Sequence, residues 1–217
     1  MTLLRTILTA TTGIAMMAFA TQANAYESAS QNDALSATTN MAVYEDTLPP
    51  FGFVQFCKYI PEDCGGTMGE AVRVVMNADR WNDLRLVNDA ANQAIEPVSD
   101  MDLYKVVEHW TYPQSQGDCE DYVLLKRKKL MMMGWPAEAL LITVVRNKQK
   151  EGHAVLTIAT DKGDFVLDNL TTEILQWQNT GLTYYKRQSQ SDPRQWVSLK
   201  PGRLTAKSDS VANIPAR

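Results

Sequence analysis

Apolar residues recur at helical spacing in the first part of the chain and gather in short runs further on. The spacing predicts helices over 68–78, 81–95 and 119–133, and a shorter one over 102–110. Gly134 follows the strongest of these helices as a C′ residue, and Pro136 prevents its continuation. Runs rich in Val, Ile, Leu and Thr predict strands over 139–146, 153–160 and 164–168, and edge strands over 182–187 and 195–199. Helices followed by an antiparallel sheet indicate an α+β domain.

The first residues have a different character. Residues 1–25 carry one charge, Arg5, then an apolar run, and end in Ala23-Asn24-Ala25, which is typical of a cleaved secretory signal peptide. The uninterrupted apolar core is shorter than the roughly 20 residues that a membrane anchor needs. Residues 26–48 are polar and without periodicity, which predicts a flexible segment. We therefore expect an exported, periplasmic protein with a folded domain over 49–204 and a disordered tail over 205–217.

Composition excludes several classes of protein. The chain has 217 residues, of which 45% are hydrophobic and 21% charged, as in a globular protein with a sizeable core. Its formal net charge of −4 argues against nucleic-acid binding, because gripping phosphate needs a concentrated excess of Lys and Arg. The basic run from Lys126 to Lys129 lies near a helix C-terminus, where it is read as a solvated face.

Export places the three cysteines in an oxidising compartment, where paired thiols form disulfides. Cys57 and Cys64 are seven residues apart, with Pro61 and following glycines permitting a tight turn, so we predict that they form a disulfide. Closing so short a loop stabilises the fold by roughly 2 kcal/mol on the loop-entropy model. Cys119 is left over, and it is either a buried core residue or a reactive thiol.

Cys119 begins the strongest predicted helix. Free backbone N–H groups and the positive end of the helix dipole favour a thiolate there, and the same groups could bind an oxyanion. A nucleophilic thiol needs a base, and the base needs a group that fixes its tautomer. Of the two histidines, His153 begins a strand and is the candidate base, whereas His109 is read as a structural or surface residue. Asp168, at the end of the next strand, is the candidate partner of His153.

Whether these two residues touch depends on the hairpin register, which periodicity leaves open. A turn centred near Thr160-Asp161 brings His153 and Asp168 into contact. A turn centred on Lys162-Gly163 puts them four positions out of register, roughly 13 Å along the strand. The alternative interpretation is that His153 merely ends a strand and that Asp168 forms an Asx turn.

Three acidic residues, Asp118, Glu120 and Asp121, surround the cysteine. They could simply cap the helix and complement its dipole. However, like charges raise one another's pKa values, so three carboxylates oppose formation of a thiolate. A bound Ca²⁺ would offset this charge, and clustered carboxylates are ligands that Ca²⁺ prefers. These residues are therefore a candidate calcium site.

The same segments carry a family resemblance. Gly117-Asp118-Cys119-Glu120-Asp121-Tyr122, His153-Ala154-Val155-Leu156 and Val166-Leu167-Asp168-Asn169 resemble the three signature blocks of the bacterial transglutaminase-like cysteine proteinases, which include the LapG-type periplasmic proteases. The likeness extends over about residues 50–199. It implies a papain-like, transglutaminase-type core, in which N-terminal helices pack on an antiparallel sheet, and a register that unites His153 with Asp168.

The resemblance also implies partners. Proteases of this type depend on calcium, cut a large secreted adhesin near its N-terminus and are held by an inner-membrane cyclic-di-GMP receptor. We therefore expect a cysteine protease with the triad Cys119, His153 and Asp168, acting on an exported protein. Two other functions stay open on the sequence. One is a non-catalytic module that binds a peptide or partner on the same fold, and the other is a cell-wall peptide amidase.

Overall fold

The computed structural model describes residues 39–64 and 70–201. The predictions of a signal peptide over 1–25 and of a disordered tail over 205–217 lie outside these ranges, as does most of the predicted flexible segment. Among the described residues, no helix combines the length and the apolarity that crossing a bilayer requires.

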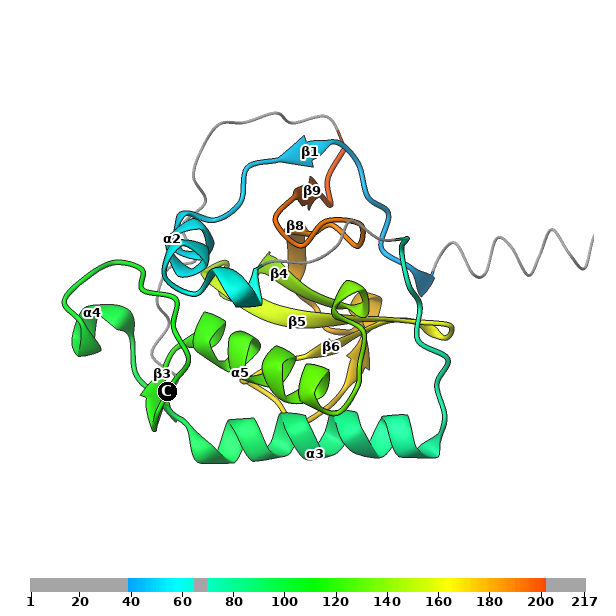
Figure 1. The fold of residues 1–217 in the computed structure, drawn as a ribbon, viewed down its shortest axis with the longest axis horizontal. Coiled ribbons are helices and arrows are strands. Elements are labelled where there is room, and N and C mark those ends of the chain that lie inside the picture. Colours follow the sequence, from blue (N-terminus) through cyan, green and yellow to red (C-terminus); the bar gives the residue numbers. More distant parts are fainter. Residues whose placement is uncertain (1–38, 65–69, 202–217) are drawn as a thin grey trace, which may run out of the picture. The chain divides into compact units, whose positions relative to one another are not determined.

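A seven-stranded antiparallel sheet forms the centre of the domain (Figure 1). Its strand order is β1-β9-β8-β4-β5-β6-β7. The strands span Asp46–Thr47 (β1), Leu140–Arg146 (β4), Gly152–Thr160 (β5), Gly163–Leu167 (β6), Leu175–Gln176 (β7), Thr183–Gln188 (β8) and Trp196–Ser198 (β9). Two further strands, β2 (Glu96–Pro97) and β3 (Gln116–Gly117), pair in parallel and hold together the two chain segments that precede the candidate site.

In the described part of the chain, four α-helices accompany the sheet, spanning Phe51–Tyr59 (α2), Ala78–Ala94 (α3), Asp100–Leu103 (α4) and Cys119–Met132 (α5). Short 3-10 turns span Pro61–Asp63, Ala137–Ala139 and Trp177–Asn179. Helix α5 packs on β5, and α3 packs on α5 (Figure 1). The main core lies between α5 and the sheet, where Val123 and Leu130 of α5 join Leu156 and Ile158 of β5. The predicted α+β class with helices on an antiparallel sheet is confirmed.

Most predicted elements are present, and Gly134, with φ +85°, ends α5 in the left-handed conformation expected of a C′ glycine. The helix predicted over 68–78 is wrong for residues 70–77, which form no helix, and Val74 instead bridges to Thr160. The short helix over 102–110 is also wrong beyond Leu103. The segments 182–187 and 195–199 are strands but not edge strands, since β8 lies between β9 and β4 and β9 lies between β1 and β8.

The folded domain begins before Pro49. Met41 is buried, and its backbone N–H donates to the Asp164 carboxylate at 2.8 Å. Strand β1 then pairs with β9, with Thr47 opposite Trp196. The polar composition of 26–48 does not predict this early start of the domain. Residues 41–47 are anchored by a single buried apolar side chain, Met41, and by backbone hydrogen bonds.

The basic run at the end of α5 is not a solvated face. Lys126 and Arg127 are buried, while Lys128 is exposed. The prediction fails because α5 is packed on more than one side: α3 lies against it, and Arg127 donates to the Leu140 carbonyl at the start of β4. The predicted disulfide between Cys57 and Cys64 is confirmed, and it closes the loop that follows α2.

Candidate active site

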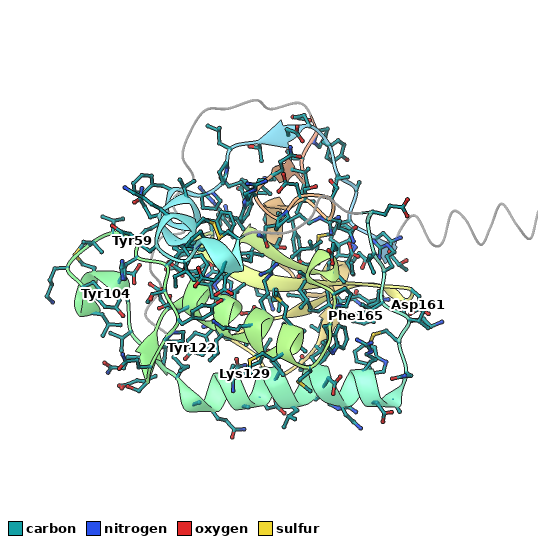
Figure 2. The ribbon with its side chains drawn as sticks, viewed as in Figure 1. Tyr59, Tyr104, Tyr122, Lys129, Asp161 and Phe165 are labelled. Carbon is teal, nitrogen blue, oxygen red and sulfur yellow. A yellow bond between two sulfur atoms is a disulfide. The ribbon has the colours of Figure 1, made fainter. Side chains whose placement is uncertain are left out.

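The helix that carries Cys119 begins at the cysteine itself. Strand β3 leads into it, and Asp118 occupies the N-cap position with extended backbone angles. Only 3% of Cys119 is exposed, so the thiol is shielded from bulk water. Tyr122, labelled in Figure 2, donates its hydroxyl to the Ile95 carbonyl at 2.5 Å and so ties the first turn of α5 to the end of α3. The position of the sulfur is therefore set by both β3 and α3.

Gly117 has a role that the sequence did not indicate. A Cβ atom at this position would lie 2.6 Å from Oδ2 of Asp121, which is closer than real Cβ contacts allow. The glycine therefore makes room for an acidic side chain of the site.

His153 and Asp168 are in contact. Nε2 of His153 lies 2.8 Å from Oδ1 of Asp168, and both residues are buried. Burial would raise the pKa of Asp168, but the hydrogen bond and charge of His153 hold that pKa below its ordinary value. The turn of the hairpin is Asp161-Lys162, between the two registers considered from the sequence, because Thr160 pairs with Gly163.

The other ring nitrogen of His153 is free. Nδ1 is buried and has no hydrogen-bond partner among the described residues. The next residue, Ala154, directs its backbone N–H at the sulfur of Cys119, which favours the thiolate. The start of β5 thus lies beside the start of α5 through Ala154, although His153 Nδ1 itself makes no hydrogen bond to the Cys119 thiol, which donates to Glu120.

Buried carboxylates surround the sulfur. Asp100, Asp118 and Glu120 each offer an oxygen, and these three oxygens lie within 4.8 Å of one another. Asp118 and Glu120 were predicted from the sequence. Asp100 of α4 was not predicted. It lies 18 residues before Asp118 in the sequence, and nothing in its local pattern shows that the fold places it beside the helix that carries Cys119. Asp121 lies beside this group, and its Oδ1 accepts the Thr111 N–H at 2.9 Å.

The carboxylates are incompletely satisfied. One oxygen each of Asp100, Asp118, Glu120 and Asp121 is buried without a hydrogen-bond partner among the described residues. Asp118 makes no side-chain capping bond to α5, and its Oδ2 instead accepts the Asp100 N–H at 3.1 Å. Helix capping therefore does not account for this group, whereas a bound cation would use the unpartnered oxygens.

Electrostatics point the same way. Burial, together with the charge of Asp118, raises the pKa of Asp100 to about 6, and burial raises that of Asp121 to about 8. Burial and the neighbouring charges also raise the pKa of Glu120 well above its ordinary value. The Cys119 thiol donates to Oε2 of Glu120 at 3.1 Å, and burial and the charges of Glu120 and Asp118 raise its pKa well above the ordinary value. Without a cation, this site favours a protonated thiol.

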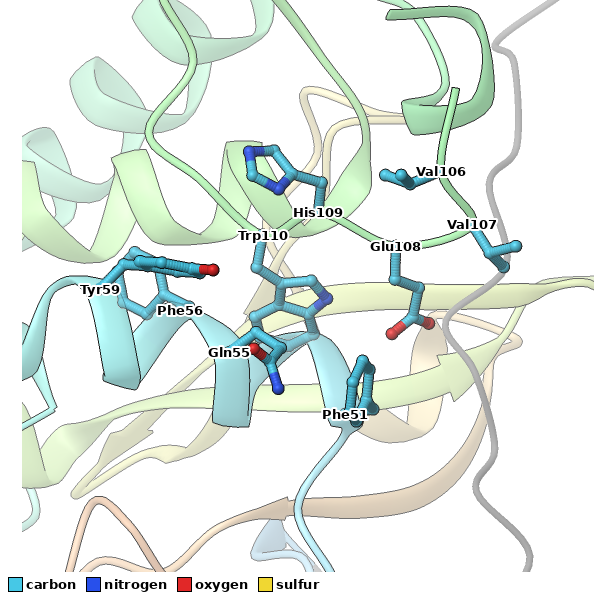
Figure 3. Close-up of a pocket in the computed structure, with 9 residues that line it drawn as sticks. All are labelled: Phe51, Gln55, Phe56, Tyr59, Val106, Val107, Glu108, His109 and Trp110. Carbon is cyan, nitrogen blue, oxygen red and sulfur yellow. The ribbon is translucent and has the colours of Figure 1, made fainter. Parts of the chain in front are cut away.

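A separate concavity lies away from these residues. A pocket of about 530 Å³ opens between α2 and the segment 106–110 (Figure 3). Phe51, Tyr59 and Val107 give it an apolar wall, and His109 borders it. The His109 side chain is exposed, consistent with its reading as a structural or surface residue, while its backbone N–H donates to the Asp100 carboxylate of the acidic cluster. None of Cys119, His153 and Asp168 lines this pocket.

Comparison with known proteins identifies the family. The family model described as bacterial transglutaminase-like cysteine proteinase matches residues 43–203, and the chain belongs to this family. No curated protein matches the sequence.

Among the solved structures that are similar to the chain are two of LapG. Calcium-bound LapG from Legionella pneumophila is 23% identical, with a TM-score of 0.48, over 58% of this chain and 73% of that one. EGTA-treated LapG from the same organism is 26% identical, with a TM-score of 0.44, over 49% of this chain. The match spans 62% of that LapG chain, which is less than two thirds of its length.

Proposed function

We propose that this protein is a periplasmic, calcium-dependent cysteine protease with the triad Cys119, His153 and Asp168. The observation that carries the proposal is the state of His153, whose Nε2 is bonded to Asp168 at 2.8 Å while its buried Nδ1 has no partner among the described residues. A histidine held in this way has its Nε2–H tautomer fixed by the carboxylate, so Nδ1 can accept a proton. The thiol at the start of α5 is the proton donor.

The reaction is acyl transfer to the sulfur. His153 Nδ1 takes the thiol proton, and the thiolate attacks the peptide carbonyl carbon to form a tetrahedral intermediate. The imidazolium then gives its proton to the leaving amine, the C–N bond breaks, and a thioester remains on Cys119. His153 next takes a proton from water, whose oxygen attacks the thioester. This releases the new carboxyl end of the substrate and returns the thiol.

Asp100, Asp118 and Glu120 would hold the calcium ion, with Asp121 beside them. Their four unpartnered, buried oxygens suit a hard cation that prefers oxygen ligands. Bound calcium supplies positive charge that offsets the carboxylates. Glu120 would then face the cation rather than hold the thiol proton, and the Ala154 N–H would be left to stabilise the thiolate.

The substrate is proposed from the resemblance to be an exported, adhesin-like protein, cut near its N-terminus. An inner-membrane cyclic-di-GMP receptor is the regulator that the same resemblance implies. Both require a periplasmic location, which rests on the signal-like segment 1–25.

A direct test uses the mature chain and the exported protein fraction of its own organism. New protein N-termini are labelled and identified after incubation with the wild type in calcium. The expected result is a small set of new termini that Cys119→Ala and excess EGTA both abolish. Release of stem peptides from purified cell wall, with no cleavage of any exported protein, would instead identify a cell-wall amidase. Absence of both activities, with a thiol that reacts with iodoacetamide only near a pH of about 8.5, would indicate a binding module.

A further inference from the structure

Asp168 is held by a hydrogen bond from α3, and the charge of a lysine on α5 acts on its carboxylate. It stands just beyond the end of β6, where the strand ladder no longer fixes it. Its Oδ1 accepts both the His153 bond and the Leu170 N–H, the latter at 3.0 Å. The carboxylate can therefore orient His153 only if the backbone around residue 168 keeps its place.

Helix α3 supplies that support through two asparagines one turn apart. Nδ2 of Asn92 donates to the carbonyl of Asp168 at 3.0 Å and to that of Thr171 at 3.1 Å. Asn88, which is fully buried, makes two longer bonds of 3.4 Å to Thr171 and Thr172. Asparagine is a weak helix former, so these two residues stabilise α3 less than alanine or leucine would and are better explained by their contacts.

Helix α5 supplies a charge. Lys126 is 1% exposed, and its Nζ lies 5.8 Å from the centre of the Tyr122 ring. It stands seven residues after Cys119, which is two helical turns to within about 20°, so one face of α5 carries both residues. No carboxylate oxygen among the described residues lies within ion-pair distance of Lys126. The carboxylates whose charge acts on it are those of Asp168, which is the stronger, and Asp89.

A buried lysine without an ion pair is costly, and burial lowers the pKa of Lys126 to about 7. Methionine would fill a similar volume with no charge to desolvate. A buried charge without an ion pair breaks the usual rule that buried charges are paired, and such exceptions are expected at functional sites. The charge of Lys126 acts on the Asp168 carboxylate, which gives a functional reason for burying it. While His153 is neutral, the buried Asp168 carboxylate would otherwise have no positive charge near it.

We propose that Asn92 and Lys126 are positioning residues for Asp168, with Asn92 fixing its backbone and Lys126 keeping its carboxylate ionised while His153 is neutral. This inference rests on the proposed function, in which Asp168 orients His153. The groups that face Asp168 are His153, Lys126 and Tyr184. Those that face Lys126 are Asp168, Asp89 and Tyr122.

Proton NMR of the full chain measures the positioning directly. The Nε2–H of His153 in its bond to Asp168 gives a low-field signal, and His109→Ala assigns it, because the chain has only two histidines. The test variants are Lys126→Met and Asn92→Ala. The controls are Lys129→Met on the same helix and Asn82→Ala, an exposed asparagine of α3.

In Lys126→Met we expect the signal to disappear, on acidification, at a higher pH than in the wild type, because loss of the positive charge makes Asp168 easier to protonate. In Asn92→Ala we expect a broadened signal at every pH. Peptide cleavage should fall about tenfold in kcat with KM unchanged in both, since neither residue touches substrate. If either variant fails to fold by circular dichroism, Lys126→Gln or Asn92→Ser replaces it.

Signals and kcat like those of the wild type in folded test variants would overturn the inference, and so would equal losses in test and control variants. Failure of the proposed function looks different, because the wild type itself would then cleave no protein while the low-field signal still responded to the variants.

Discussion

Nε2 of His153 lies 2.8 Å from Oδ1 of Asp168, although the two residues are not cross-strand partners. The last pair of the ladder is Leu156 with Leu167, so continuing the register by one residue puts Val155 opposite Asp168. His153 is thus a diagonal neighbour, and such neighbours on one face remain within reach of long side chains. A two-residue turn at Asp161-Lys162 produces this offset. Gly163 permits that turn, since its φ is +108° and a Cβ would lie 2.8 Å from the Thr39 carbonyl oxygen.

Replacing the two histidines separately tests the assignment of the base. His153→Ala should lower kcat/KM by at least about 10³-fold, because the thiol then has no proton acceptor. His109→Ala, which removes an exposed side chain and keeps the backbone N–H that donates to Asp100, should leave kcat/KM within about twofold of the wild type. Cleavage of a peptide that spans the identified site measures both. An active His153→Ala protein would exclude His153 as the base.

Calcium and protons should compete for the acidic cluster. The pKa values of Asp100 and Asp121, about 6 and about 8, are raised in the folded chain without metal. That chain therefore binds more protons than the unfolded chain from about pH 4 to 8, and its stability falls as the pH rises through this range. Calcium replaces the protons, so we expect the rise in Tm on adding calcium to chelator-treated protein to be larger at pH 8 than at pH 5.

Thermal unfolding of two variants provides the control for this prediction. Asp100→Asn should lose most of the calcium-dependent rise in Tm, whereas Asp79→Asn, an exposed acid in the first turn of α3, should keep it. A rise of equal size at both pH values, or one that survives Asp100→Asn, would place the calcium elsewhere.

Gly117→Ala should weaken calcium binding. The added methyl group would meet the Asp121 carboxylate at 2.6 Å and displace it. We expect an approximately tenfold loss in calcium affinity, equivalent to about 1.4 kcal/mol, by isothermal titration calorimetry. Gly134→Ala is the matched control, because the space around it is open while its positive φ strains the new residue. It should lower Tm and leave calcium affinity unchanged. Unchanged calcium affinity in Gly117→Ala, together with a loss in Gly134→Ala, would rule out the steric explanation.

Removing the disulfide should destabilise the fold modestly. Cys57→Ser combined with Cys64→Ser should lower the free energy of unfolding by about 2 kcal/mol, as the loop-entropy model gives for so short a loop. The effect also passes to α5, because Asp63 in this loop accepts bonds from Tyr112 and Lys128, at 2.7 and 3.2 Å. Urea denaturation measures the change. Adding reductant should destabilise the wild type by a similar amount and leave the double variant unaffected.

The sequence determined local features of this protein. It predicted α5 and its glycine end, the strands β4 to β6, the disulfide, and Cys119 at a helix start, because apolar periodicity, glycine and short sequence separation act over a few residues. His153 and Asp168 could be proposed because the chain has so few histidines and because family signature blocks surround both residues.

Only the tertiary structure decided what depends on distant segments. Asp100 joins the acidic cluster through the fold of α4, which no local pattern records, and Asp121 needs the space left by Gly117. Lys126 lies in a basic run that is typical of a solvated face, yet it is buried because α3 covers α5. The hairpin register likewise depended on one turn that requires Gly163, which has a positive φ and leaves no room for a Cβ beside Thr39. Burial and register are properties of the whole fold, so the chemistry of this site becomes visible only when the segments are brought together.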